Sequence, residues 1–346
     1  MRAEASTEAG GLRSFVHMTQ LRTTGIAGTG SYLPERVVDN AYFEGILDTN
    51  DEWIQQRTGI AQRRYVADGE ENSHMCVAAA KQAMAEAGVE ADELDLIIVA
   101  TISGDHQMPA TACLVQKELG AKNAGAFDVQ AACSGFVTAL SVGEAFVSSG
   151  RNDCVLVIGA EALSRFLDLE DRGSAILFGD GAGAAVLTPH SKCQRGEILK
   201  TSLGADGEGW DHIWIPSGGT KRPACKESVA EREHFIRVNG REVYRFAVKR
   251  MGEVIGDMMD GHTHDELGLI VPHQVNQRII DAAVERHAIP AEKVMVNIGR
   301  YGNTSAASVP IALHEAVEAG RMEDGKLVVL AAFGAGLTWA GALLRW

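Results

Sequence analysis

No apolar segment of this 346-residue sequence approaches the roughly 20 residues that a membrane-spanning helix requires. The first 20 residues also lack an apolar block of signal-peptide length, so we expect a cytoplasmic protein. Proline is scarce at 8 residues and charged residues make up 23%, whereas hydrophobic residues reach 46%. This composition excludes a disordered or fibrous chain and predicts a globular protein with a large core.

The sequence also lacks closely spaced cysteine pairs, and it has fewer basic than acidic residues. The six cysteines include no CxxC pair, which argues against a zinc site of that type, and a reducing compartment disfavours a disulfide framework. Each cysteine is expected to be a small buried residue unless its context indicates otherwise. Basic residues number 32 against 46 acidic ones, a net charge of −14. Such a surface repels nucleic acid and anionic lipid, so an anionic partner needs a local basic patch.

What the chain does contain is one internal repeat. Residues 92–99 (DELDLIIV) return as residues 265–271 (DELGLIV), 173 positions later. Each copy is a short apolar run after an acidic turn, which is typical of a buried parallel strand. The matching segments that follow are strands at 125–129 and 294–298, helices at 134–151 and 304–321, and strands at 154–159 and 327–333.

This repeated strand–helix–strand order predicts two similar α/β halves whose equivalent helices pack against each other. We expect the halves at residues 24–190 and 191–346, after a flexible leader over residues 1–23. The glycine-rich segment 178–187 (FGDGAGAAVL) lies in an apolar strand pattern without a following helix. It therefore does not predict a dinucleotide-binding site.

The repeat aligns Cys133 with Asn303, because each precedes its central helix. A helix start presents free N–H groups and a positive dipole end, so we expect the pKa of the Cys133 thiol to be lowered toward neutrality. Small residues on both sides (AACSG) leave the sulfur open to a substrate. Asn303 alone is as readily explained as a helix N-cap.

His273 directly follows the repeated strand of the second half, at the end where open α/β sheets bind ligands. A thiolate at Cys133 can attack a thioester, while neutral His273 and Asn303 can donate hydrogen bonds to an enolate oxygen. Hydrolases with Cys, His and Asn use the Asn to orient the His instead. The placement of Asn303 opposite the cysteine favours two independent donors.

At these residues the sequence resembles the β-ketoacyl-acyl carrier protein synthase III family of thiolase-like condensing enzymes. The matching stretches are DTNDEWIQQRTGI (48–60), QAACSGF (130–136), DRGSAILFGDGAGAAVL (171–187), VPHQVNQRI (271–279), GRYGNTSAAS (299–308) and FGAGLTWAGALLRW (333–346). The resemblance implies a duplicated five-layer αβαβα fold, a homodimer and no metal or cofactor. It also implies a ping-pong reaction: acyl-CoA acylates Cys133, and decarboxylation of malonyl-acyl carrier protein gives an enolate held by His273 and Asn303.

The resemblance also implies roles for residues around this centre. The backbone N–H groups of Cys133 and Ala335 would form the oxyanion hole, and Met108 of a neighbouring subunit would line the acyl pocket, which favours short primers such as acetyl. The remaining positions divide into contacts to CoA (Trp53, Arg57, Arg172 and Asn276) and contacts to the carrier protein (Gln274 and Arg278).

A basic stripe supports the expectation of an acidic carrier protein. Arg241, Arg245 and Lys249 are spaced four residues apart on a predicted helix, which puts them on one face. Such a stripe is ordinarily a solvated face, but against a charge of −14 it predicts a docking site. Two alternatives remain open: a related ketosynthase or acyltransferase of a specialised pathway, and a non-catalytic scaffold that binds acyl-CoA or carrier protein.

Overall fold

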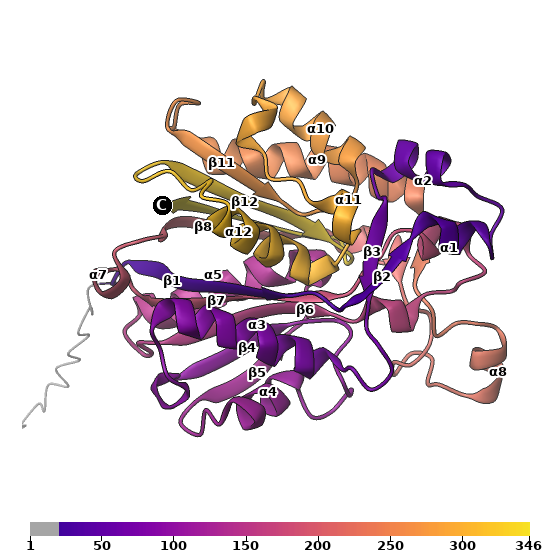
Figure 1. Cartoon of the computed structure of the whole chain (residues 1–346), viewed down its shortest axis with the longest axis horizontal. Helices are drawn as coiled ribbons and strands as arrows, with labels where there is room; N and C mark the ends of the chain where they lie inside the picture. Colours follow the sequence, from indigo (N-terminus) through magenta and orange to yellow (C-terminus); the bar gives the residue numbers. More distant parts are fainter. Residues whose placement is uncertain (1–20) are drawn as a thin grey trace, which may run out of the picture.

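The computed structural model describes residues 21–346 and contains two large β-sheets that face each other across a pair of helices (Figure 1). The first sheet is formed by β1 (Thr24–Tyr32), β4 (Leu96–Ala100), β5 (Gly125–Val129), β6 (Val155–Glu161) and β7 (Gly181–Pro189). The second is formed by β8 (Glu197–Ala205), β11 (Leu267–Pro272), β12 (Leu327–Gly334) and β13 (Thr338–Arg345).

The two sheets share one topology. Their orders are β1-β7-β6-β4-β5 and β11-β12-β13-β8. In the first, β4 and β6 run parallel, and β7 and β1 follow antiparallel. In the second, β11 and β12 run parallel, and β13 and β8 follow antiparallel. Each sheet therefore repeats the same four-strand unit, as the duplicated sequence predicted.

Helices complete a five-layer arrangement (Figure 1). Between the sheets lie α5 (Gly135–Ser148) and α12 (Ser308–Glu318), while α3 (Asn72–Ala87) and α4 (Thr111–Leu119) cover the outer face of the first sheet. The outer face of the second sheet carries α9 (Gly240–Met259) and α10 (Gln277–Arg286). Because α5 and α12 are covered on both sides, they are apolar almost all round and join both sheets in one hydrophobic core. The predicted αβαβα fold is confirmed.

Smaller elements flank these layers. The helices and strands are β2 (Arg36–Asp39), α1 (Asn40–Glu44), α2 (Asp51–Thr58), β3 (Gln62–Tyr65), α6 (Arg172–Ala175), α7 (His190–Cys193), β9 (Ile213–Trp214), α8 (Lys226–Ala230), β10 (Arg237–Val238) and α11 (Ile298–Tyr301). Short 3₁₀ turns occupy Ala91–Glu93, Ala132–Ser134, Leu163–Phe166, Gly207–Gly209, Ala291–Lys293 and Ser305–Ala307. Among residues 21–346, no helix combines the length and the apolar character needed to cross a membrane.

The equivalence of Cys133 and Asn303 that the repeat predicted is wrong. The 3₁₀ turns before the two central helices, Ala132–Ser134 and Ser305–Ala307, are again 173 positions apart. The structural counterpart of Cys133 is therefore Ala306. The predicted helices, 134–151 and 304–321, lie 170 positions apart; α5 has 14 residues and α12 has 11, so only the ends of the two helices keep that offset, and their starts do not.

The strand predicted at residues 294–298 is also wrong. Only Val294 forms a bridge, to β11. The backbone beyond it is bound by the side chain of Gln274, which donates to the carbonyl of Met295 and accepts from the N–H of Asn297. Since a side chain satisfies these groups, they are not available to a strand ladder.

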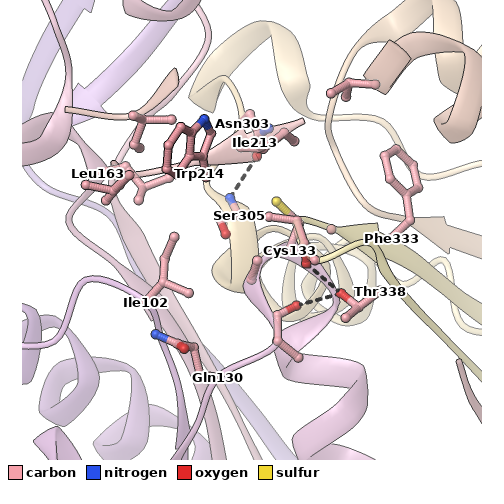
Figure 2. Close-up of a pocket in the computed structure, with 18 of the residues that line it drawn as sticks. Ile102, Gln130, Cys133, Leu163, Ile213, Trp214, Asn303, Ser305, Phe333 and Thr338 are labelled. Atoms are coloured by element: carbon pink, nitrogen blue, oxygen red, sulfur yellow. Dashed lines mark hydrogen bonds between the residues drawn. The ribbon is translucent and has the colours of Figure 1, made fainter. Parts of the chain in front are cut away.

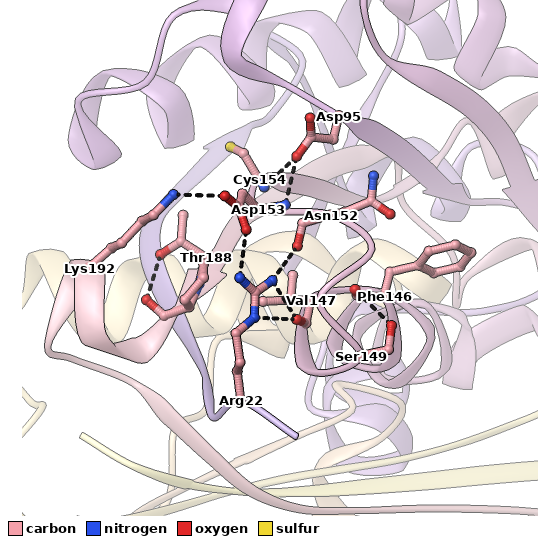
Figure 3. Close-up of polar contacts among 11 residues, drawn as sticks. Arg22, Asp95, Phe146, Val147, Ser149, Asn152, Asp153, Cys154, Thr188 and Lys192 are labelled. Atoms are coloured by element: carbon pink, nitrogen blue, oxygen red, sulfur yellow. Dashed lines mark hydrogen bonds and ion pairs between the residues drawn. The ribbon is translucent and has the colours of Figure 1, made fainter. Parts of the chain in front are cut away.

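The start of the described chain is fixed through Arg22 (Figure 3). Its guanidinium donates twice to the carbonyl of Val147, at 3.2 and 2.9 Å, and pairs with Asp153 at 2.7 Å. The leader predicted over residues 1–23 therefore ends too late, because Arg22 is already bound to the end of α5. Residues 1–20 of that leader lie outside the described residues.

Candidate active site

A cavity of about 580 Å³ is lined by residues of both halves of the fold, and we call it the central cavity. Cys133, His273 and Asn303 all line it. Figure 2 shows the sulfur of Cys133 on the side of Asn303 and Ser305. The remaining wall is mainly apolar and includes Ile102, Leu163, Phe178, Ile213, Trp214, Ile236 and Phe333. The structure thus brings the three predicted residues together around a space suited to an acyl chain.

Cys133 lies in the 3₁₀ turn before α5 and is only 9% exposed. Burial raises the pKa of its thiol to about 12, the Glu161 carboxyl acts in the same direction, and a hydrogen bond with Ser305 opposes them. The expected lowering of this pKa is wrong, because α5 begins only at Gly135 and desolvation of the sulfur outweighs the helix start. Burial of the sulfur therefore favours the thiol over the thiolate in the free site.

His273 follows β11 and is fully buried. Burial lowers the pKa of its imidazole to about 3, so the ring is neutral at physiological pH. Its Nδ1 lies 2.5 Å from the Ser308 hydroxyl, and that hydroxyl accepts a hydrogen bond from the Gln274 N–H. The hydroxyl proton is therefore free for Nδ1, which places the ring proton on Nε2. Within the described residues Nε2 has no hydrogen-bond partner, so it can serve a ligand in the central cavity.

Asn303 is 5% exposed and has its carboxamide orientation set by one bond. The oxygen accepts from the N–H of Ser305 at 2.8 Å, drawn as a dashed line in Figure 2. Asn303 is not a helix N-cap, because Thr304 precedes the 3₁₀ turn and Ala307 precedes α12; the N-cap interpretation is wrong. With the oxygen engaged, the NH₂ group is the part of Asn303 that can donate to a ligand.

His273 and Asn303 are held by different partners. The imidazole Nδ1 is bound by Ser308 and the carboxamide oxygen by the Ser305 backbone. A hydrolase-type relay needs the Asn side chain on the His ring. The geometry instead provides two separate N–H donors beside one thiol, which suits stabilisation of an enolate oxygen.

The loop after β12 approaches the backbone of the thiol turn. A Cβ on Gly334 would lie 2.7 Å from the backbone N of Cys133, so only glycine fits there. Ala335, the next residue, lines the central cavity together with Cys133. The two predicted oxyanion-hole positions therefore share one wall of the cavity.

Gln274 does not lie on a docking surface, and its predicted contact with a carrier protein is wrong. The residue is 1% exposed, and its side chain donates to the carbonyls of Pro272 and Met295 and accepts from the N–H groups of Asn297 and Ile298. Gln274 thereby links the end of β11, which precedes His273, to residues 295–298, which precede Asn303.

Replacing Gln274 with Leu is expected to lower the free energy of unfolding by about 2–4 kcal/mol, because it leaves buried backbone groups without partners. Urea denaturation followed by circular dichroism measures the loss. Gln56→Ala is the control, since Gln56 is exposed and bonds only Glu52 on its own helix. Equal stabilities of the two variants would show that Gln274 is not a structural link.

The residues predicted to bind CoA gather around α2. The guanidinium carbons of Arg172 and Arg57 lie 4.8 and 5.8 Å from the ring centroid of Trp53. The side chain of Asn276 caps α10 and donates to the carbonyl of Arg57 at 2.9 Å. An aromatic face flanked by two exposed cations results.

The predicted basic stripe is exposed on α9. Arg245 pairs with Glu242 at 3.1 Å, and Lys249 lies 4.0 Å from Glu253. Arg278, on α10, lies beside this stripe of Arg241, Arg245 and Lys249. Its guanidinium carbon is 5.6 Å from the ring centroid of Tyr244 on α9. We call these four bases the α9 patch.

Met108 is 86% exposed and does not line the central cavity of its own chain. Sequence reasoning missed three residues next to the site. Ser308 bonds His273, Ser305 bonds Asn303 through its backbone, and Glu161 accepts a hydrogen bond from Ser305. Hydroxyl residues at a helix start are common caps. Their sequence positions therefore carried no sign of contacts with Cys133 and His273.

Two sheets with the same four-strand unit, helices between and outside them, and a Cys–His–Asn cavity define a thiolase-like condensing-enzyme fold. Residues 127–207 match the family described as 3-oxoacyl-[acyl-carrier-protein] synthase III, and residues 259–346 match its C-terminal family. The chain belongs to the β-ketoacyl-acyl carrier protein synthase III family.

Individual relatives agree over nearly the full length. The chain is 49% identical over 329 residues to the β-ketoacyl-acyl carrier protein synthase III of Symbiobacterium thermophilum, covering 94% of this chain and 99% of the relative. The crystal structure of the Aquifex aeolicus synthase III matches with a TM-score of 0.85 at 46% identity, covering 93% and 100%. The priming β-ketosynthase of the R1128 polyketide pathway matches with a TM-score of 0.86 at 37% identity, covering 94% and 97%.

Proposed function

We propose that this chain condenses an acyl-CoA primer with malonyl-acyl carrier protein, with loss of CO₂, through an acyl group on Cys133, and so initiates fatty acid synthesis. The observation that carries this proposal is the convergence of a buried thiol and two independently held N–H donors, on His273 and Asn303, in one largely apolar cavity. Relatives at 45–49% identity bear the name of this activity.

The reaction has two halves. The Cys133 sulfur attacks the primer thioester, the backbone N–H groups of Cys133 and Ala335 stabilise the tetrahedral oxyanion, and CoA leaves as the free thiol. Malonyl-carrier then enters and loses CO₂. His273 Nε2–H and the Asn303 NH₂ stabilise the enolate oxygen, and the enolate carbon attacks the acyl-cysteine carbonyl. The product is a 3-ketoacyl-carrier, and the Cys133 sulfur is released. No step requires a metal or cofactor.

CoA binding is assigned to the cluster around α2. A flat aromatic ring flanked by two cations suits an adenine base and its phosphates. Trp53 would stack on the base while Arg57 and Arg172 face the phosphates. Asn276 contributes by holding the end of α2 against α10.

Carrier docking is assigned to the α9 patch, with Arg278, Arg241, Arg245 and Lys249. Arg278→Glu is expected to raise the KM for malonyl-carrier about 3- to 10-fold at low salt, with a smaller effect at higher salt. Acylation of Cys133 by acyl-CoA should be unchanged. Steady-state kinetics and intact-mass spectrometry measure the two half-reactions. Lys117→Glu, at an exposed position on α4, is the matched control, and equal damage to both half-reactions would refute the assignment.

We also propose that two copies of this chain form a homodimer and that the protein is cytoplasmic. Met108 is highly exposed in the single chain, as expected of a residue that enters the acyl pocket of a second copy. In that position it would limit the primer, and short primers such as acetyl are favoured. Sedimentation at micromolar concentration tests the assembly, and Met108→Ala tests whether longer primers gain access.

The central experiment supplies a panel of acyl-CoA primers with malonyl-acyl carrier protein and follows both CO₂ release and labelled product. Condensation with CO₂ release supports the proposal. The match to a polyketide priming enzyme makes a specialised pathway the second candidate, which a preference for unusual primers or carriers would favour. If none of the primers adds acyl mass to Cys133, the result would indicate a non-catalytic scaffold.

A further inference from the structure

Thr338 is a hydroxyl residue of the central cavity whose side chain joins two distant segments of the chain (Figure 2). Its Oγ1 lies 2.9 Å from the Ser134 hydroxyl and 3.2 Å from the carbonyls of Ala131 and Ala335. Ser134 and Thr338 are 204 positions apart in sequence. None of the reaction steps proposed above assigns a role to either hydroxyl.

The first segment is the 3₁₀ turn Ala132–Ser134, which carries the thiol of Cys133. Ala132 has a backbone φ of 45°, a left-handed conformation that a residue with a side chain rarely adopts and that its surroundings must hold. The carbonyl of Ala131 accepts from the N–H and from the hydroxyl of Ser134, at 3.1 and 2.8 Å. The turn is thus closed on itself, and Thr338 bonds it where it closes.

The second segment is the tip of the β12–β13 hairpin, which carries Ala335. Gly334 and Thr338 are paired in the ladder, so the tip consists of the three residues between them. Leu337 exchanges two backbone hydrogen bonds with Asp206, at 2.9 and 2.8 Å, which fixes one end of the tip. At the other end, the Thr338 hydroxyl donates to the carbonyl of Ala335. Thr338 therefore ties the backbone of Ala335 to the turn that carries the thiol.

Stabilisation of an oxyanion depends on how exactly its donors are placed. The two N–H groups assigned to the oxyanion hole belong to Cys133 and Ala335, one from each segment, and both residues line the central cavity. Donors from separate segments act together on one oxygen only while their spacing is constant, because reorganisation during the reaction consumes the gain. The close approach of Gly334 brings the segments together, and the Thr338 hydroxyl supplies polar contacts between them.

We propose that Thr338 is a positioning residue that, together with the Ser134 hydroxyl, holds the two N–H groups of the oxyanion hole at a fixed spacing. The two hydroxyls carry two protons and share the carbonyls of Ala131 and Ala335, so removing one hydroxyl leaves one side-chain proton for two carbonyls. Because its proton is directed at protein acceptors, Thr338 acts on the substrate only through the backbone. This inference rests on the acyl-cysteine chemistry proposed above.

Acyl transfer and alkylation of Cys133 make different demands on an oxyanion hole. Attack of the sulfur on a thioester, and attack of the enolate on acyl-Cys133, both place negative charge on the acyl carbonyl oxygen. In alkylation by iodoacetamide, the sulfur bonds to the CH₂ carbon, the C–I bond breaks, iodide takes the electron pair and the thiol proton goes to water. No oxyanion forms in that reaction. A variant whose two N–H donors are misplaced should therefore lose acyl transfer and keep alkylation.

The main variant is Thr338→Val, which keeps the shape of the side chain and removes the hydroxyl. At saturating acyl-CoA, acylation of Cys133 should slow about 10- to 100-fold, less than the loss of a donor itself. The KM for acyl-CoA, the rate of alkylation by iodoacetamide and CO₂ release from malonyl-carrier should each stay within about twofold of wild type. Intact-mass spectrometry over time measures acylation and alkylation on the same protein.

Two matched variants show whether the hydroxyl itself matters. Thr338→Ser retains the hydroxyl and should keep acylation within about threefold of wild type. Thr188→Val makes the same change at a buried threonine at the end of β7, outside the cavity lining, and should leave all of these rates unchanged.

Ser134→Ala removes the other hydroxyl and keeps the test available if the valine variant does not fold. It should also slow acylation, and combining it with Thr338→Val should cost less than the product of the single losses, because the two hydroxyls contact each other. Unchanged acylation in both variants would overturn the proposal, as would equal losses of acylation and alkylation, which indicate a general distortion of the site. If no primer adds acyl mass to the wild type while iodoacetamide still alkylates it, the proposed function fails instead.

Discussion

The Cys133→Ala variant is expected to lose acyl transfer from acyl-CoA by at least about 10⁴-fold, the scale on which removing a covalent nucleophile acts. Intact-mass spectrometry should show no added acyl mass, and no 3-ketoacyl product should form. The fold should persist, because the change removes one small sulfur atom from the wall of an open cavity rather than from the packed core.

The same variant should still release CO₂ from malonyl-carrier. That step uses His273 and Asn303, whose positions are held by Ser308 and by the Ser305 backbone rather than by the sulfur. Cys113→Ala is the matched control, since Cys113 is an exposed cysteine on α4 and should leave both half-reactions intact. Acyl mass on the Cys133→Ala protein would place the nucleophile elsewhere and end the proposed mechanism.

The second large effect concerns the two donors. His273→Ala and Asn303→Ala are each expected to slow condensation about 10²- to 10³-fold, as the loss of one preorganised donor to a developing oxyanion does. Acylation of Cys133 should stay within about threefold of wild type, because in the proposed reaction the two donors act on the enolate and not on the acyl transfer to Cys133. Single-turnover condensation with pre-acylated enzyme isolates the affected step.

The pH dependence separates two independent donors from a relay. Because burial lowers the pKa of His273 to about 3, the imidazole stays neutral as pH falls from 8 to 5, and the single-turnover rate should not fall through its protonation over that range. His314→Ala, at a histidine bound to Thr29 and absent from the cavity lining, is the control. A loss of condensation centred near pH 6.5 would mean that His273 titrates like a free imidazole, which contradicts the buried geometry.

These two effects also bear on the choice between hydrolase and condensing chemistry. The sequence alone supplied Cys, His and Asn, which fit either. The structure separates the partners of the His ring from those of the Asn carboxamide, so the two side chains face a ligand rather than each other. Hydrolysis of acyl-Cys133 faster than condensation would favour the relay that the geometry disfavours.

By itself, the sequence determined the fold class, the duplication and the identity of the three cavity residues. Strand periodicity and the 92–99 and 265–271 repeat carry that information, because period and apolar character are local properties of the chain. The stops of α5 and α12 are also local, because Gly150 and Gly320, two residues beyond each helix, have φ of 75° and 65°, where glycine is favoured.

Tertiary structure alone decided how the site works. The protonation of Cys133 depends on how deeply the sulfur is buried and on nearby charge, and the charge of Glu161 acts on it from 28 positions away in sequence. Gln274 became a buried link rather than a surface contact because four backbone groups from two segments close around it. Burial and long-range hydrogen bonds are properties of the packed chain. For this reason the pKa values and the true counterpart of Cys133 could not be obtained from spacing.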